Sequence, residues 1–169
     1  VLNDFLIFVD RNPEYEPELE QAIALFSETE ATDVNEELGA YYLKNNDKTK
    51  ALSYYEAAYQ KNPNDVNVLR NLMLLQLQAQ QFEKAATLSE EALAFYPAQA
   101  VFYLVYGVAQ NGLGNAQQAV DYLEMGVDYV IENPQMQADF YSELARGYQA
   151  LGNAEKAAEY RTRLKNLTQ

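Results

Sequence analysis

Apolar residues along most of this chain recur at spacings of three and four, which places their side chains on one face of an α-helix. Leu38 and Tyr42 mark one such face, and Ala51 and Tyr55 mark the next. Between them lies a polar break at residues 45–47, where the sequence reads Asn-Asn-Asp. The pattern therefore predicts two short amphipathic helices joined by a tight turn.

This helix pair recurs along the chain at an interval of 34 residues. Ala51, Ala85 and Ala119 keep that interval, and so do Pro63 and Pro97. A proline lacks the amide hydrogen and disfavours helix in the residue before it, so each proline is expected to end a unit. A period of 34 residues is typical of helix–turn–helix repeat arrays.

We expect these repeats to form a single domain. The expected segments are a degenerate N-terminal helix pair at residues 1–31, repeats at 32–65, 66–99 and 100–137, and a last repeat with a capping helix at 138–169. The sequence Leu-Gly-Asn-Ala at 151–154 copies residues 113–116 at an offset of 38, so the third repeat contains a four-residue insertion. We expect the insertion to lengthen the second helix of that repeat or the loop after it.

The two ends of the chain differ in polarity. Residues 1–9 are apolar nearly all round, and a helix of this kind must be buried on all sides. In the last helix, Arg161 and Lys165 stand where the earlier repeats have mostly apolar residues, which gives the polar outer face that a terminal repeat needs for solubility. The chain is therefore expected to be the C-terminal part of a longer array.

The repeat pattern over residues 32–169 resembles the tetratricopeptide repeat family. The shared motifs are Leu-Gly-x-x-Tyr at 38–42, Tyr-Gly at 106–107, the two Leu-Gly-Asn-Ala segments, the spaced alanines and the closing prolines. The resemblance implies an all-α fold, a right-handed α-solenoid of antiparallel helix pairs. Tyr42, Tyr55 and Tyr148 fall on packing positions of the family, so we expect them in the core. The pattern is also similar to bacterial repeat proteins, many of which sit in the cell envelope, while a cytoplasmic location stays open.

In the resembled family, the first helix of each unit lines a concave groove that holds extended peptides or segments of a partner protein. Carried over to this chain, the predicted partner-binding residues lie on the first helices of the second, third and fourth units. They are Asn67, Arg70, Asn71, Leu74 and Leu77; Val101, Leu104, Val105, Val108 and Asn111; and Ser142, Arg146 and Gln149. The corresponding residues of the first unit are Asp33, Glu36, Ala40 and Leu43.

The middle of this predicted surface, from Leu74 to Val108, is apolar. An apolar patch rimmed by polar groups usually marks an interaction site. The alternative is that neighbouring or upstream parts of the superhelix cover it. The three asparagines can hydrogen-bond to the backbone of an extended peptide, because an amide offers both donor and acceptor. The two arginines can bind a carboxylate or form surface ion pairs.

The amino-acid composition of the chain and the motifs that it lacks exclude several classes of function. The chain has no histidine and no cysteine, which excludes imidazole-based catalysis, thiolate metal sites and disulfides. It contains no phosphate-binding loop, calcium loop or dinucleotide fingerprint. No run approaches the roughly 20 apolar residues that span a membrane. We therefore expect no enzyme activity, no cofactor, no metal site and no membrane insertion.

The charge of the chain is strongly acidic, with 25 acidic and 12 basic residues and a net charge of −13. Residues 12–43 hold nine carboxylates and no lysine or arginine, and residues 85–145 hold eight carboxylates and again no base. This disfavours nucleic acid, because phosphate binding requires clustered basic side chains. The acidic residues form either a solubilising surface or a field that steers a basic partner.

The sequence thus predicts a protein–protein interaction scaffold whose partner is a protein or a peptide. Two alternatives stay open. The first is a carbohydrate-binding module, if several of the 14 tyrosines face the groove. The second is a self-association module, in which the apolar patch or the helix at residues 1–9 forms a homo-oligomer interface.

Overall fold

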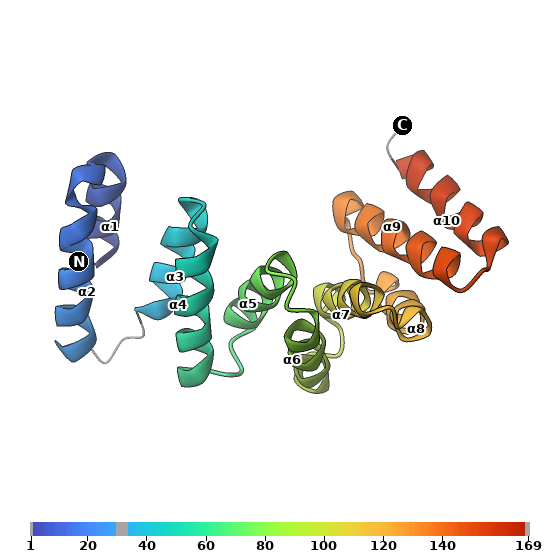
Figure 1. The fold of residues 1–169 in the computed structure, drawn as a ribbon, viewed down its shortest axis with the longest axis horizontal. Coiled ribbons are helices and arrows are strands. Elements are labelled where there is room, and N and C mark those ends of the chain that lie inside the picture. The colour runs from blue at the N-terminus through green and yellow to red at the C-terminus, as the bar shows by residue number, and fades with distance from the viewer. Residues whose placement is uncertain (1, 30–33, 168–169) are drawn as a thin grey trace. The chain divides into compact units, whose positions relative to one another are not determined.

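The computed structural model describes residues 2–29 and 34–167 (Figure 1). Within these ranges the regular structure is entirely helical. The chain divides into two compact units, Val1–Val68 and Leu69–Gln169, and each has buried residues of its own.

The first unit is built from short helices joined by tight turns. Its elements are α1 (Leu2–Arg11), the 3-10 helix η1 (Pro13–Tyr15), α2 (Glu16–Thr29), α3 (Asn35–Lys44) and α4 (Lys48–Lys61). The predicted polar break is the turn between α3 and α4, where the side chain of Asp47 accepts a hydrogen bond from the Lys50 backbone N–H at 3.0 Å. This bond caps the start of α4. Tyr42 and Tyr55 are buried, as the sequence predicts.

α1 buries one face and not its whole surface. Leu2, Leu6 and Val9 are spaced by four and three and are buried. Ile7 and Phe8 are 45% and 44% exposed. The sequence predicted burial on all sides, which the helix does not have within this unit, because the other described helices cover only one of its sides.

The second unit continues the helix pairs. It begins within α5 (Val66–Gln78) and contains α6 (Phe82–Phe95), α7 (Ala100–Leu113), α8 (Ala116–Val127), α9 (Pro134–Ala150) and α10 (Ala154–Leu167). Gly114 and Gly152 follow α7 and α9 with φ angles of 82° and 74°. Glycine adopts this left-handed conformation without steric penalty, so it can stop one helix and let the next begin. The repeated Leu-Gly-Asn-Ala motif is therefore a turn between paired helices.

The four extra residues of the third repeat do not lengthen α8, which ends at Val127. The loop after it takes residues 128–133, and α9 has 17 residues where α7 has 14. The side chain of Asn133 caps α9 by accepting a hydrogen bond from the Met136 backbone N–H at 3.0 Å. Pro134 occupies the first helical position, where no N–H is needed. The insertion therefore lengthens the loop and the start of α9.

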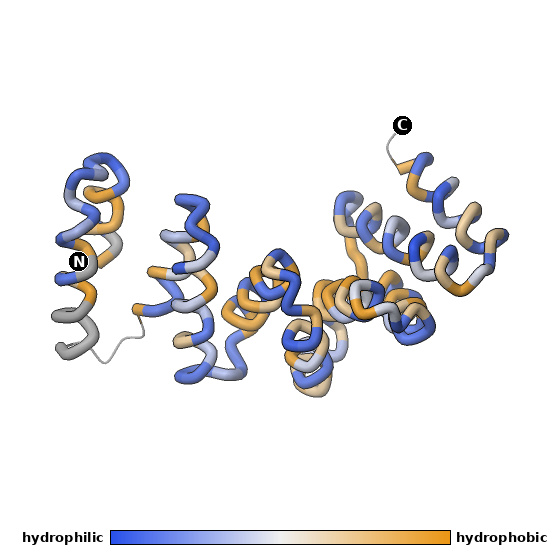
Figure 2. Tube along the Cα trace, in the orientation of Figure 1, coloured by the Kyte–Doolittle hydropathy of each residue, from blue (hydrophilic) through white to orange (hydrophobic). Residues whose placement is uncertain are grey.

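The core of the second unit collects side chains from α7 to α10. Leu123, Phe140 and Leu144 are fully buried, and Tyr148 is buried as predicted. Hydrophobic positions fill α7, whereas α10 is mostly hydrophilic (Figure 2). Arg161 of α10 is exposed. α7 therefore supplies core side chains around much of its circumference, while α10 contributes one buried face.

Candidate partner-binding surface

α7 carries an apolar stripe that is partly open to solvent. Val101, Leu104 and Val108 are spaced by three and four and are half-buried, while Phe102 and Tyr106 of the same helix are buried. The spacing places the three side chains on one side of the helix, beside the core face. Leu104 also packs against the core, so it supports the fold as well as the stripe.

Val105 is a core residue. The sequence predicts it on the same surface, but its side chain is only 1% exposed. α7 is apolar nearly all round, so the helical period alone does not separate its core positions from its surface positions. The candidate surface therefore does not include Val105.

Asn111, near the end of α7, is engaged by α9. Its Nδ2 donates to the backbone oxygen of Glu143 at 3.0 Å and to the Glu143 carboxylate at 2.9 Å. The same carboxylate lies 3.5 Å from the guanidinium of Arg146. Because the amide nitrogen of Asn111 is used within the chain, this residue ties α7 to α9 and has only its carbonyl oxygen to offer a partner.

The predicted residues of α9 are exposed. Ser142, Arg146 and Gln149 follow one another at spacings of four and three, so they share one face of the helix. Gln149 Oε1 accepts a hydrogen bond from Arg161 Nη2 of α10 at 3.0 Å. Arg146 lies next to Glu143, the α9 residue that Asn111 contacts, so α9 brings polar side chains to the Asn111 end of α7.

The remaining predicted residues lie on α5. Leu74 is 38% exposed and Arg70 is exposed one turn before it, whereas Asn71 and Leu77 are half-buried. Asn67 precedes the boundary between the units and belongs to the first one. The predicted surface within the second unit thus consists of exposed and half-buried residues on α5, α7 and α9.

Tyrosines of α7 and α9 pack against other rings inside the second unit. Tyr106 is buried and stacks on Tyr122 with 4.0 Å between ring centroids. Tyr148 is buried and stacks on Tyr160 at 5.8 Å. A carbohydrate platform needs exposed aromatic rings, so these pairs give the carbohydrate-binding alternative no support.

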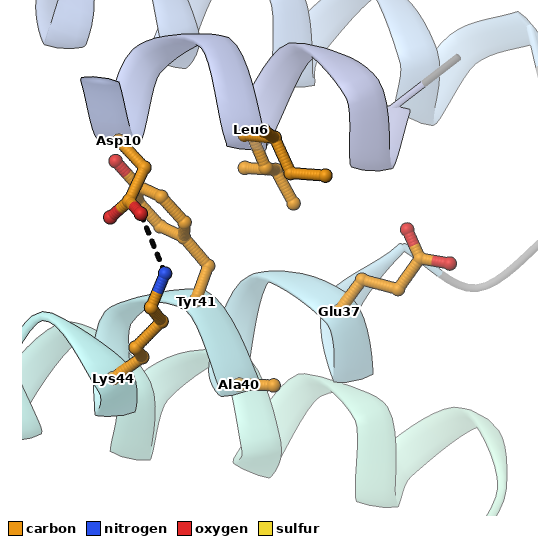
Figure 3. Close-up of a pocket in the computed structure, with 7 residues that line it drawn as sticks. Leu6, Asp10, Glu37, Ala40, Tyr41 and Lys44 are labelled. Atoms are coloured by element: carbon orange, nitrogen blue, oxygen red, sulfur yellow. Dashed lines mark hydrogen bonds and ion pairs between the residues drawn. The ribbon is translucent and has the colours of Figure 1, made fainter. Parts of the chain in front are cut away.

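The first unit contains a cavity of about 360 Å³ between α1 and α3 (Figure 3). It is lined by Leu6, Ile7 and Asp10 of α1 and by Glu37, Ala40, Tyr41 and Lys44 of α3. Of the groove residues expected in the first unit, Ala40 lines this cavity and Asp33 lies outside the described residues. The sequence did not predict the α1 side, because α1 stands outside the 34-residue period and its facing positions cannot be read from the repeat.

An ion pair lies at one end of this cavity. Lys44 Nζ is 2.6 Å from Asp10 Oδ2. The hydrogen bond and the charge of Lys44 lower the pKa of the Asp10 carboxyl, which favours its carboxylate form. Glu37 is exposed at the opposite end of the cavity (Figure 3).

No family model and no curated protein matches the sequence. The chain is similar to solved structures of MamA. MamA from Desulfovibrio magneticus RS-1 is 17% identical, with a TM-score of 0.79 over 99% of this chain and 93% of that one. MamA AMB-1 is 20% identical, with a TM-score of 0.73 over 99% of this chain and 97% of that one. At such identities the likeness concerns the fold, and it confirms the predicted all-α solenoid of tetratricopeptide type.

Two further observations concern only residues 2–29 and 34–167. No helix in these ranges is long and apolar enough to cross a bilayer. The same ranges contain no group of three or more acidic side chains placed to hold a metal ion. The candidate surfaces are the side chains on α5, α7 and α9 and the cavity between α1 and α3.

Proposed function

We propose that this protein is an interaction scaffold that binds a partner protein or peptide on the face formed by the first helices of its repeats. The observation that carries the proposal is the half-buried apolar stripe of α7, Val101, Leu104 and Val108, on a helix whose Asn111 end meets polar side chains of α9. Apolar side chains that are open to solvent and bordered by polar groups are typical of interaction sites. Stacked helix pairs of the all-α solenoid fold present helix faces on which such a site can form.

The stripe offers a partner both apolar contact and polar positioning. Val101 and Val108 can pack against apolar side chains of a bound segment, and burial of that surface drives association. Ser142 of α9 and the Asn111 carbonyl oxygen can hydrogen-bond to the backbone of the segment. This division of roles is common at interfaces, which combine an apolar centre with a polar rim.

The test compares the partners captured by the wild-type chain with those captured by a Val101→Ser/Val108→Ser variant. Each protein is chemically cross-linked in native lysate, and mass spectrometry identifies the captured proteins. Both substitutions shorten half-buried side chains, so the helix keeps its backbone and its core residues. Phe95→Ser/Met125→Ser is a matched control, because it removes two exposed apolar side chains from the second helices α6 and α8. Circular dichroism checks that every variant is folded.

We expect the stripe variant to lose a partner that the wild type and the control both capture. Equal capture by the stripe variant and the wild type would remove α7 from the binding surface and defeat the proposal.

Self-association is the second candidate, because exposed apolar side chains also lie outside the first helices. Phe95 is 66% exposed and Ile131 is 82% exposed. The test is light scattering over a range of concentrations, with the wild type and the Phe95→Ser/Met125→Ser variant measured side by side. A molar mass that rises with concentration only in the wild type supports self-association through the second helices. A constant monomer mass in both rejects it.

A further inference from the structure

The cavity between α1 and α3 combines an apolar wall with an uneven set of charges. Leu6 is buried at its side and Ile7 is half-exposed at its rim. Asp10 and Lys44 neutralise each other at one end, and Glu37 lies at the other (Figure 3). The wall therefore suits an apolar group, and the charges do not balance.

Glu37 is the source of this imbalance. Among the described residues it has no hydrogen-bond or ion-pair partner, although it is exposed beside the apolar wall. A cation bound there would meet a carboxylate whose charge no neighbouring base offsets. A carboxylate ligand would instead be repelled by Glu37 and would find Lys44 already paired with Asp10 at 2.6 Å.

The charge around the cavity acts in the same direction. Residues 1–68 carry 14 of the 25 acidic side chains and 5 of the 12 basic ones, which gives this unit a net charge of −9 out of −13 for the chain. A field of one sign raises the local concentration and the association rate of ligands of opposite charge. The unit therefore attracts basic segments before any specific contact forms.

The volume of the cavity limits what fits. About 360 Å³ lies near the lower end of the range of about 300–1,000 Å³ found for small-ligand sites. This is room for one large apolar side chain together with part of a neighbouring residue. It is too small for a folded element of a partner.

We propose that this cavity binds a partner segment in which a large apolar side chain stands next to a lysine or arginine. The apolar side chain packs against Leu6, Ile7 and Ala40, and the cation pairs with Glu37. The inference rests on the proposed scaffold function and gives the first unit a ligand chemistry, that of a basic, partly apolar peptide.

The experiment is fluorescence anisotropy with the whole chain and a labelled hexapeptide of sequence Gly-Leu-Lys-Gly-Leu-Lys. Two comparison peptides replace both leucines by serine or both lysines by glutamate. Each peptide is titrated at low ionic strength and at about 0.15 M salt, where exposed charges are screened beyond about 8 Å. We expect the leucine–lysine peptide to bind more tightly than either comparison peptide at both salt concentrations.

Variants locate the binding. Glu37→Gln should weaken binding of the leucine–lysine peptide about threefold, since solvent screens an exposed ion pair and keeps its contribution small. Ala40→Trp should weaken it further by filling the cavity, because Ala40 is exposed and its replacement disturbs no core. Glu18→Gln is the matched control, because it removes an exposed carboxylate of α2 in the same unit that does not line the cavity.

Three results would overturn the inference. In the first, Glu37→Gln and Glu18→Gln weaken binding of the leucine–lysine peptide equally. In the second, Ala40→Trp binds that peptide as tightly as the wild type does. In the third, the leucine–glutamate peptide binds as tightly as the leucine–lysine peptide. The proposed function is judged separately by partner capture with the Val101→Ser/Val108→Ser variant. If the peptides do not bind but the Val101→Ser/Val108→Ser variant still loses the captured partner, the cavity ligand is rejected and the scaffold function is kept.

Discussion

Replacement of Gly107 by alanine tests the close approach of α7 and α8, on which the packing of the third repeat depends. A Cβ atom at this position would lie 2.3 Å from Leu123 Cγ and 2.5 Å from Leu123 Cδ2. Ordinary van der Waals contact begins near 3.4 Å. The two helices must therefore separate by about 1 Å, or the fully buried Leu123 must leave its rotamer.

Two opposing contributions set the size of the effect. Overpacking a buried contact destabilises a protein by about 1–3 kcal/mol, and an overlap this severe belongs in the upper half of that range. Alanine in place of glycine inside a helix stabilises it by about 1 kcal/mol. We therefore expect Gly107→Ala to lower the free energy of unfolding by roughly 1–2 kcal/mol.

The assay is urea unfolding followed by circular dichroism for Gly107→Ala, Leu123→Ala and the double variant. Leu123→Ala alone leaves a cavity in the core and should destabilise by about 2–5 kcal/mol. In the double variant the added methyl group at position 107 occupies part of that cavity. The double variant should therefore be more stable than the sum of the single effects predicts, by about 1 kcal/mol or more.

Gly114→Ala is the matched control. A Cβ atom there meets no heavy atom within 4 Å, but the φ angle is 82°. Gly114→Ala should lower the free energy of unfolding by about 1–2 kcal/mol through backbone strain. Its effect and that of Leu123→Ala should simply add. Strict additivity of Gly107→Ala with Leu123→Ala, or a net stabilisation by Gly107→Ala alone, would refute the close-approach argument.

Two further predictions concern polar contacts of the second unit. Burial by itself raises the pKa of Glu124, but hydrogen bonds from Tyr148 and Lys156 and the charge of Lys156 lower it overall from its ordinary value of 4.5. A carboxyl with a lowered pKa stabilises the fold above pH 4.5, and this stabilisation is lost as the pH falls through the pKa of Glu124 in the folded state. The difference in urea midpoint between the wild type and Glu124→Gln should therefore shrink on acidification. Asn111→Ala should destabilise by about 1–2 kcal/mol in urea unfolding, because two hydrogen bonds to Glu143 disappear; an unchanged midpoint would show that α9 does not depend on them.

The repeat positions were predictable from the sequence because one steric requirement recurs at each of them. Gly39 and Gly107 sit where paired helices come closest, and a Cβ atom at Gly39 would lie 2.8 Å from the ring of Tyr55. At the equivalent position of the second repeat, Met73 faces the small Ser89. Each of these contacts therefore keeps a small residue on one of its two helices, and the spacing of small residues reveals the helix pairs. Tyr42 and Tyr148 occupy the same position of their repeats, a packing position of the resembled family, which is why their burial could be predicted.

Side-chain pairing between helices could not be predicted in this way. Asn111 contacts Glu143 over a separation of 32 residues, and Tyr160 contacts Glu124 over 36. These contacts follow neither the period of 34 nor a shared motif, because each depends on which polar side chains happen to meet across a helix interface. Val105 was misplaced for a related reason, since a helix apolar on most sides gives no signal for its core face.

The two candidate surfaces differ in the force that would hold a partner. The stripe on α7 offers apolar side chains, and burial of apolar surface is little affected by moderate salt. The cavity between α1 and α3 offers Glu37 in a unit of net charge −9, and exposed charge interactions weaken as the screening length falls from about 8 Å to about 3 Å between 0.15 M and 1 M salt. Salt therefore separates charge from apolar contact in the binding of an intact partner: the share of binding that is lost at 1 M salt belongs to the acidic unit, and the share that survives belongs to apolar contacts of the stripe and of the cavity wall.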